Sequence, residues 1–536
     1  MNTDAAHATP INLKLLLASR KAQAASFAVV ALFGVLLLAS PALFYIGVLL
    51  GLVLATWYVK APIDLGGNLD RIAPYTSKYA SAIALVIAVG WMAFTATLPL
   101  DDLLRHIQAA SWGFNYIPHY EHHILDTSWS WTIGFDAVVG AVHSITGDVL
   151  ITSRIVRAAE TLFVGGALLL AINRATSNNA LRFLALALAL IGMVWPRIQL
   201  GRPEVIFTGL VFSACFLRRG WWLALFALLS PAYAFSPIYA AAAVLLGRGD
   251  EPFARRLARN ALVAVAAVAL SFAFWFWYTN GQYTKVYTLL TAVLDVQSSA
   301  KLSVGELLPL VAVMAAPICI FIITGLLYVV WRQAAYIGSK PGIRQQIILL
   351  LVVAFYFSLP NYVRYAPIIW SLFILAALFA IGDELPPGAP AAWLWISGAL
   401  FIALNIAPRG ETVPTEVLKA MRVPAGSKVL APFNRASYIA VAANPEAIVT
   451  PIFDISAVTQ PYRDLVVRLS EGKFDCGTVE LPEFDYVMEN TLNGNAPPCL
   501  SFVASQGSLK LWLVKKATAT PKVIGPATAA LLPAVP

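Results

Sequence analysis

Apolar runs of roughly 20 residues recur along most of this chain, from about residue 25 to residue 406. A helix that crosses a bilayer needs about 20 mostly apolar residues. Hydrophobic residues make up 59% of the sequence and charged residues only 12%, about half the charged share of an average soluble protein. So few charges could not cover that much apolar surface in water. The pattern therefore predicts a polytopic α-helical membrane protein and excludes soluble enzymes, secreted modules, fibrous proteins and disordered chains.

The apolar runs predict about 11–13 transmembrane helices within residues 1–406. The expected spans are 25–40, 41–59, 79–98, 155–172, 182–197, 204–217, 221–247 (two short helices that meet at Ser230-Pro231), 261–278, 305–331, 345–359, 366–382 and 391–406, with a partial or re-entrant helix at 132–147. Basic residues cluster in loops that should be cytoplasmic. The stretches left for the extracytoplasmic face, where we expect the chemistry, are 99–131, 196–204, 279–304, 360–365 and everything after 407.

After residue 407 the composition becomes that of a small soluble domain. Short strands are expected at 429–433, 447–453, 484–489 and 500–514, the last folding back as a hairpin at Gln506-Gly507. Helical patterns near 414–421 and 461–471 complete a small α/β domain over 407–515, and the Pro/Ala-rich residues 516–536 predict a disordered tail. Cys476 and Cys499 invite a disulfide, which suits an extracytoplasmic domain. The alternative is two unrelated free thiols.

The acid pair Asp101-Asp102 directly follows the expected span 79–98 and opens a long external loop at 99–131. The residues after the pair form an amphipathic pattern, which predicts a helix lying along the outer interface of the membrane. A carboxylate at that level suits a general base that accepts a proton from a hydroxyl acceptor. The alternative is a helix cap, because Asp is favoured where helices begin. Local sequence favours neither interpretation over the other.

The same external loop is rich in polar residues that could contact a substrate or a metal ion. The candidates are Arg105, His106, His119, Glu121, His122 and His123. Glu121, His122 and His123 are weak candidates for a divalent cation, since their spacing matches no zinc motif such as HExxH. A solvated or substrate-contacting loop explains them better, so no metal ligand is assigned.

Two further external turns and one loop carry cations suited to a phosphate group. Arg202 and Glu204 lie in one turn, Arg364 and Tyr365 lie in another, and Lys285 lies in the aromatic stretch 279–304. A guanidinium gives two parallel charge-assisted bonds to phosphate oxygens. The alternative is membrane anchoring, because Arg and Tyr often lie at the headgroup level.

Taken in order, these motifs resemble the GT-C superfamily of membrane glycosyltransferases. The resemblance rests on the acid pair after an early span, the aromatic external loop, the segment ending at 145–148, the following arginine-containing span at 153–172 and the domain that begins near 424–431. Arg202-Pro203-Glu204 is similar to the Arg-Pro-Asp turn of the protein-mannosyltransferase and aminoarabinose-transferase branch, and Arg364-Tyr365-x-Pro367 to its Arg-Tyr-x-x-Pro region. The chain departs from that branch at 126–140, at 228–240, where an expected lysine is absent, and in its extra N-terminal hairpin.

The resemblance implies a glycosyltransferase that moves a sugar from a polyprenyl-phosphate carrier to a glycan, lipid or protein acceptor on the extracytoplasmic face. Asp101 would be the base, with Asp102 in support, and Arg202, Arg364 and Lys285 would bind the donor phosphate. A single displacement would invert the anomeric centre. No cofactor is obligatory, although a divalent cation could take part. The expected location is a bacterial inner membrane, with the C-terminal domain in the periplasm.

Two other classes of function remain open at this point. A polysaccharide polymerase or ligase would use a diphosphate-linked glycan and favour arginine clusters over an acid pair. A transporter or flippase would show internal repeats and charges at the membrane midplane, and neither is prominent here. Nucleic acid is not an expected partner despite the net charge of +9, because no basic cluster with interleaved aromatic residues occurs.

Overall fold

The computed structural model describes residues 69–94, 102–116, 129–177, 179–246, 253–283, 402, 413–432, 435–450, 459–474, 476–477, 480–490 and 497–516. These residues belong to two compact units, a helical unit that ends at Val413 and a C-terminal unit that begins at Pro414. The expected spans at 25–40, 41–59, 305–331, 345–359, 366–382 and 391–406 lie outside the described residues, apart from residue 402, and so does the expected tail after residue 516.

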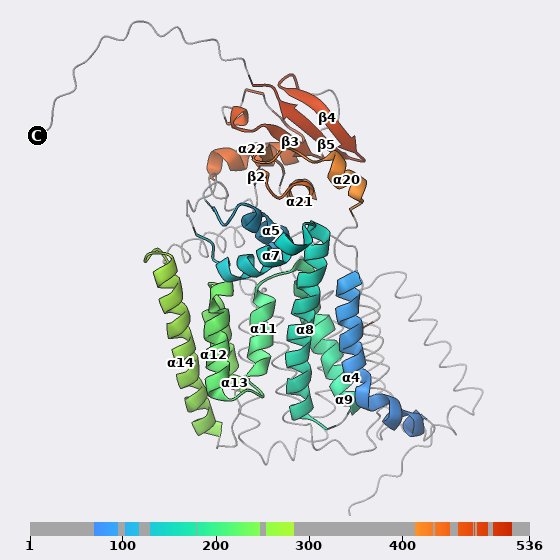
Figure 1. Ribbon diagram of the computed structural model, residues 1–536, viewed down its shortest axis with the longest axis vertical. Coiled ribbons are helices and arrows are strands. Elements are labelled where there is room, and N and C mark those ends of the chain that lie inside the picture. The colour runs from blue at the N-terminus through green and yellow to red at the C-terminus, as the bar shows by residue number, and fades with distance from the viewer. Residues whose placement is uncertain are drawn as a thin grey trace, which may run out of the picture. The chain divides into compact units, whose positions relative to one another are not determined.

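The helical unit is arranged around α8 (Val149–Ala175), which packs against α4 (Leu69–Phe94), α7 (Ile133–Thr146), α9 (Asn179–Leu186) and α11 (Glu204–Ser213) (Figure 1). The carboxylate of Asp148 caps α8 by accepting a hydrogen bond from the Ile151 amide at 2.8 Å. The other described elements of the unit are α5 (Asp102–Ser111), the π-helix η1 (Ala187–Val194), α10 (Trp195–Leu200), α12 (Arg219–Leu229), the 3₁₀-helix η2 (Ser230–Ala232), α13 (Ser236–Leu246) and α14 (Phe253–Tyr278).

The number of membrane spans differs from the sequence prediction. Two helices among the described residues, Val149–Ala175 and Arg255–Tyr278, are long and apolar enough to cross a membrane. The helix α11 has 10 residues, which at 1.5 Å per residue extend about 15 Å, half of a hydrocarbon core of about 30 Å. The prediction of a polytopic protein with about 11–13 spans is therefore wrong for the part of the chain that the structure describes.

The reason for this error is that an apolar run reports composition and not the length of one continuous helix. The expected span 182–197 is helical throughout, but its hydrogen-bond pattern changes from α9 to the π-helix η1 and back in α10. The wide turns of η1 end where Pro196, which has no amide N–H, enters the first turn of α10. The expected span 204–217 ends as an α-helix at Ser213.

The C-terminal unit contains a mixed five-stranded sheet in the order β2-β1-β3-β5-β4. The strands are β1 (Lys428–Leu430), β2 (Ile448–Thr450), β3 (Tyr486–Glu489), β4 (Leu500–Gln506) and β5 (Leu509–Val514). The parallel strand β1 lies between β2 and β3, whereas β4 and β5 form an antiparallel hairpin whose turn contains Gly507 with φ of 59°. The helices are α20 (Thr415–Ala420), α21 (Arg435–Ala443), α22 (Gln460–Ser470) and the short 3₁₀-helix η5 (Leu481–Glu483), and sequence analysis did not anticipate α21.

A disulfide joins Cys476 to Cys499, and Cys499 packs against the core of the C-terminal unit, which includes Val487 and Trp512. The bridge closes a loop with a sequence separation of 23, which in the chain-entropy treatment is worth about 3 kcal/mol. We expect the Cys476→Ser/Cys499→Ser variant to lower the free energy of unfolding of this unit by about that amount. Hydrogen exchange of the β3 and β5 amides measures the loss.

The matched control for this experiment is Cys215→Ala in the helical unit, where Cys215 is buried and outside any disulfide. That variant should leave exchange in β3 and β5 at the wild-type rate. Equal protection of these strands with and without the disulfide would contradict the expected stabilisation.

Candidate functional site

The helix α5 begins at the second residue of the acid pair and is largely buried in the helical unit. Asp102 is its first residue, and every residue from Leu103 to Ala109 is buried. The sequence predicted an amphipathic helix along the membrane interface, yet the polar side chains of Arg105, His106 and Gln108 are buried as well. The polar face of α5 is thus packed against protein groups, which must satisfy its hydrogen-bonding atoms.

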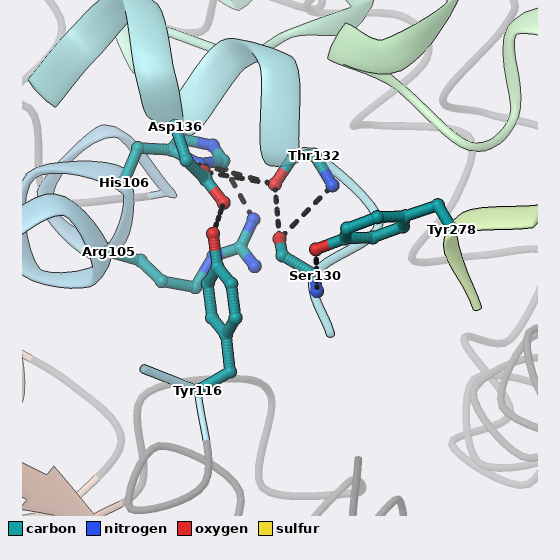
Figure 2. A network of polar contacts seen from close by, with 7 residues as sticks. All are labelled: Arg105, His106, Tyr116, Ser130, Thr132, Asp136 and Tyr278. Carbon is teal, nitrogen blue, oxygen red and sulfur yellow. Dashed lines mark hydrogen bonds and ion pairs between the residues drawn. The ribbon is translucent and has the colours of Figure 1, made fainter. Parts of the chain in front are cut away.

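The main partner of that polar face is Asp136, a buried carboxylate on α7 (Figure 2). Its Oδ1 accepts a hydrogen bond from Nδ1 of His106, which lies 30 residues earlier in the chain. Its Oδ2 accepts a hydrogen bond from the hydroxyl of Tyr116 at 2.8 Å. Nη2 of Arg105 lies 3.4 Å from Nε2 of His106. One carboxylate therefore binds two side chains, one from α5 and one from the segment directly after it.

A line of hydroxyl groups reaches Asp136 from the other side (Figure 2). Thr132 donates from Oγ1 to Asp136 Oδ1 at 3.1 Å, and Oγ of Ser130 lies 3.0 Å from Thr132 Oγ1. The Ser130 amide donates to the hydroxyl of Tyr278, the last residue of α14, at 3.4 Å. The network thus connects α5, α7 and α14.

The electrostatic setting keeps Asp136 ionised. Burial raises the pKa of Asp136, but the charge and hydrogen bond of His106, the charge of Arg105 and a hydrogen bond from Ser130 outweigh burial and hold the pKa below its ordinary value. A carboxylate that accepts several hydrogen bonds beside cationic groups behaves in this way. Asp136 is therefore an anionic acceptor at neutral pH and has no proton to give.

A second group of charged side chains surrounds the turn between α10 and α11. Oε1 of Glu204 lies 3.6 Å from Nη1 of Arg197 and 4.0 Å from Nη1 of Arg202. Arg157 and Glu160 on α8 are both buried, and Glu160 lies within electrostatic reach of Glu204. Within the described part of the chain, neither carboxylate oxygen of Glu160 has a hydrogen-bond partner. The structure thus places Arg202 in a cluster of three arginines and two glutamates.

The turn that carries Arg202 packs directly on the first turn of α5. Gly201 has φ of 64° in the left-handed region, and a Cβ atom placed on it would lie 2.6 Å from Cδ2 of Leu103. Leu103 is the residue after Asp102, so the start of α5 and the arginine turn occupy neighbouring backbone positions. The structure therefore brings the start of α5, at Leu103, next to the turn at 202–204, two regions that the sequence predicted separately.

Replacing Gly201 with alanine tests this packing. The new methyl group must move Leu103, and alanine at positive φ adds about 1 kcal/mol of backbone strain. We expect Gly201→Ala to accelerate hydrogen exchange across α5 and lower the melting temperature by several degrees. Gly147→Ala is the matched control, because Gly147 has φ of 62° but open space around it. Equal effects of the two substitutions would show that backbone strain alone is responsible and that the Leu103 contact contributes nothing.

The other predicted site residues cannot be placed. Asp101, His119, Glu121, His122, His123, Lys285, Arg364 and Tyr365 lie outside the described residues, and for Asp102 only the backbone is described. Among the residues that are described, no group of three or more His, Cys, Asp or Glu side chains could hold a metal ion.

Sequence reasoning missed Tyr116 and the roles of Arg157 and Asp136. The available signal was the position of Asp136 in an otherwise apolar helix, because a buried acid requires a partner. Nothing in the spacing identified His106 as that partner. No protein-family model matches this chain, and no curated protein matches it significantly.

Proposed function

We propose that this chain is a glycosyltransferase that moves a sugar from a polyprenyl-phosphate donor to a hydroxyl group on a glycan, lipid or protein acceptor. One observation carries the proposal: the turn bearing Arg202 packs through Gly201 on Leu103, directly after the acid pair. A carboxylate able to accept a proton and a guanidinium able to hold a phosphate therefore belong to adjacent backbone segments.

The chemistry that this arrangement supports is a single displacement at the anomeric carbon. An aspartate of the pair accepts the proton of the acceptor hydroxyl while the hydroxyl oxygen forms the new bond to the anomeric carbon. The bond from that carbon to the phosphate oxygen breaks, and its electron pair leaves with the polyprenyl phosphate. Arg202, with Arg197 nearby, stabilises the charge that grows on the departing phosphate. The configuration at the anomeric carbon is inverted.

A lipid-linked donor requires that the protein work at a membrane, and we propose the bacterial inner membrane. The helices Val149–Ala175 and Arg255–Tyr278 supply the length and composition for attachment to the bilayer. The Cys476–Cys499 disulfide supports a periplasmic location of the C-terminal unit, because disulfides persist in oxidising compartments. The proposal requires no cofactor, since arginine can neutralise a monophosphate.

The test begins with the lipid donor, which should accumulate when the protein is absent. Thin-layer analysis of lipid extracts from cells with and without the protein identifies the sugar–polyprenyl phosphate that builds up. Adding purified protein and wild-type envelope acceptors to the isolated lipid should release polyprenyl phosphate and transfer the sugar. The proposal fails if no lipid-linked sugar accumulates, or if the accumulated species is a diphosphate-linked oligosaccharide, as expected for a polymerase or ligase.

A further inference from the structure

The helix α5 has only 10 residues, and helices of this length are marginal without tertiary support. Its main support comes from α7, which it contacts at two points one turn apart. His106 on α5 binds Asp136 on α7, and a Cβ atom on Gly140 of α7 would lie 2.6 Å from Cβ of Ala110 on α5. The two contacts are four residues apart on each helix, at 106 and 110 on α5 and at 136 and 140 on α7. The helices therefore meet along matching i, i+4 ridges.

Apolar packing restricts the setting of this pair of helices less narrowly than hydrogen bonds do, because the hydrophobic effect has no direction. Hydrogen bonds have narrow ranges of distance and angle. Asp136 uses both oxygens, one for His106 and one for Tyr116, and these bonds hold α5 at its middle and beyond its end. The ring of His106 also contacts Phe135 edge-on, with ring centroids 4.7 Å apart.

The chain between α5 and Tyr116 is held in an unfavourable conformation. Phe114 has φ of 63°, in the left-handed region that residues other than glycine rarely adopt, and Gly113 before it has φ of 61°. This turn brings the chain back so that the Tyr116 hydroxyl meets Asp136. A strained backbone persists only where the surrounding contacts hold it, and the Tyr116–Asp136 bond is such a contact.

We infer that Asp136 is a positioning residue for sugar transfer: through His106 and Tyr116 it fixes the axial and rotational setting of α5, and so keeps the start of that helix against the Arg202 turn. The inference rests on the proposed function, because the residues to be positioned are the acid pair. His106 is one helical turn after Asp102, so a shift of His106 relative to Asp136 displaces the start of α5 by nearly the same amount. Misplacement of a catalytic group by about 1 Å can reduce a rate by about 10²-fold.

Three substitutions, two at Asp136 and one at Tyr116, test the inference together with one remote control. Asp136→Ala removes every hydrogen bond that the Asp136 carboxylate accepts, whereas Asp136→Asn keeps an oxygen acceptor for His106. Tyr116→Phe removes only the 2.8 Å hydrogen bond from the Tyr116 hydroxyl to Asp136. The control is Ser236→Ala, which breaks the buried Ser236–Ser271 hydrogen bond of 2.7 Å between α13 and α14. Hydrogen exchange of α5 and α8 amides is measured by mass spectrometry, together with kcat and the donor KM.

Asp136→Ala should increase exchange in α5 at least tenfold while α8 keeps its protection, and kcat should fall by about 10²-fold with the donor KM changed less than twofold. Asp136→Asn should recover most of kcat, Tyr116→Phe should give an intermediate loss, and Ser236→Ala should change neither quantity. If Asp136→Ala also loses protection in α8, its helical unit is unfolded more widely. The exchange in α5 and the kcat of Asp136→Asn and Tyr116→Phe, compared with wild type, then test the inference in folded proteins.

Unchanged exchange in α5 for both Asp136→Ala and Tyr116→Phe overturns the inference whatever the activity. Loosening of α5 with wild-type kcat overturns the link to transfer but leaves the proposed function intact. Absence of transfer by the wild-type protein overturns the proposed function itself. The exchange data then show only that Asp136 stabilises the position of α5.

Discussion

Asp101→Asn and Asp102→Asn should each reduce sugar transfer by about 10²–10⁴-fold, the usual contribution of a general base, with the melting temperature near that of wild type. An aspartate has a reference pKa near 3.9, so it is ionised at neutral pH and can accept a proton. Asparagine has nearly the same size and caps helices about as well as aspartate, but its amide cannot act as the base. The measurement is the initial rate of polyprenyl phosphate release at saturating donor.

The matched control is Asp148→Asn, because the Asp148 carboxylate caps α8 in this structure. That substitution should preserve both the melting temperature and the transfer rate. If the acid pair were only a cap for α5, its asparagine variants would behave as Asp148→Asn does. Wild-type rates in both single variants and in the double variant would leave the proposed mechanism without a base.

Arg202→Gln should lower kcat/KM for the lipid donor by about 10²–10³-fold, as expected when one group that stabilises a departing anion is lost. The fold should tolerate the change, since Glu204 keeps its contact with Arg197 at 3.6 Å. Arg202→Lys should recover only part of the loss, because an ammonium group cannot form the paired bonds of a guanidinium. Donor kinetics and competition by free polyprenyl phosphate measure the effect.

Arg182→Gln serves as the control for a lost arginine elsewhere in the helical unit. Arg182 donates to the Thr176 carbonyl at 2.7 Å, so its removal affects local stability but not the proposed site. Equal loss of transfer in the Arg182 and Arg202 variants would mean that Arg202 acts only on the fold and has no contact with the donor.

The sequence was informative wherever a local pattern decides the structure. The strand-like segment 500–514 with its turn at Gln506-Gly507 predicted the hairpin formed by β4 and β5, and the Ser230-Pro231 pair indicated the break between α12 and α13. Both features depend on residues close together in the chain, where turn chemistry and proline geometry act directly.

Features that depend on distant residues could not be predicted in this way. The bond between His106 and Asp136 joins positions 30 residues apart, and only the folded arrangement of α5 and α7 reveals it. The packing of Gly201 on Leu103 joins positions even further apart. The number of spans was overestimated for a related reason, since the length of a helix depends on where its backbone bonds end and not on hydropathy alone.

The distance along the chain between His106 and Asp136 also has a consequence for the order of assembly during synthesis. A short helix gains little stability before its tertiary partners are present, and domains fold as their residues emerge from the ribosome. When residues 102–111 first emerge, Asp136, which lies 30 residues beyond His106, has not yet emerged. The catalytic segment that we propose therefore stays without its final shape until α7 has emerged and packed. The nascent chain thus carries its acid pair in an inactive form until its scaffold exists.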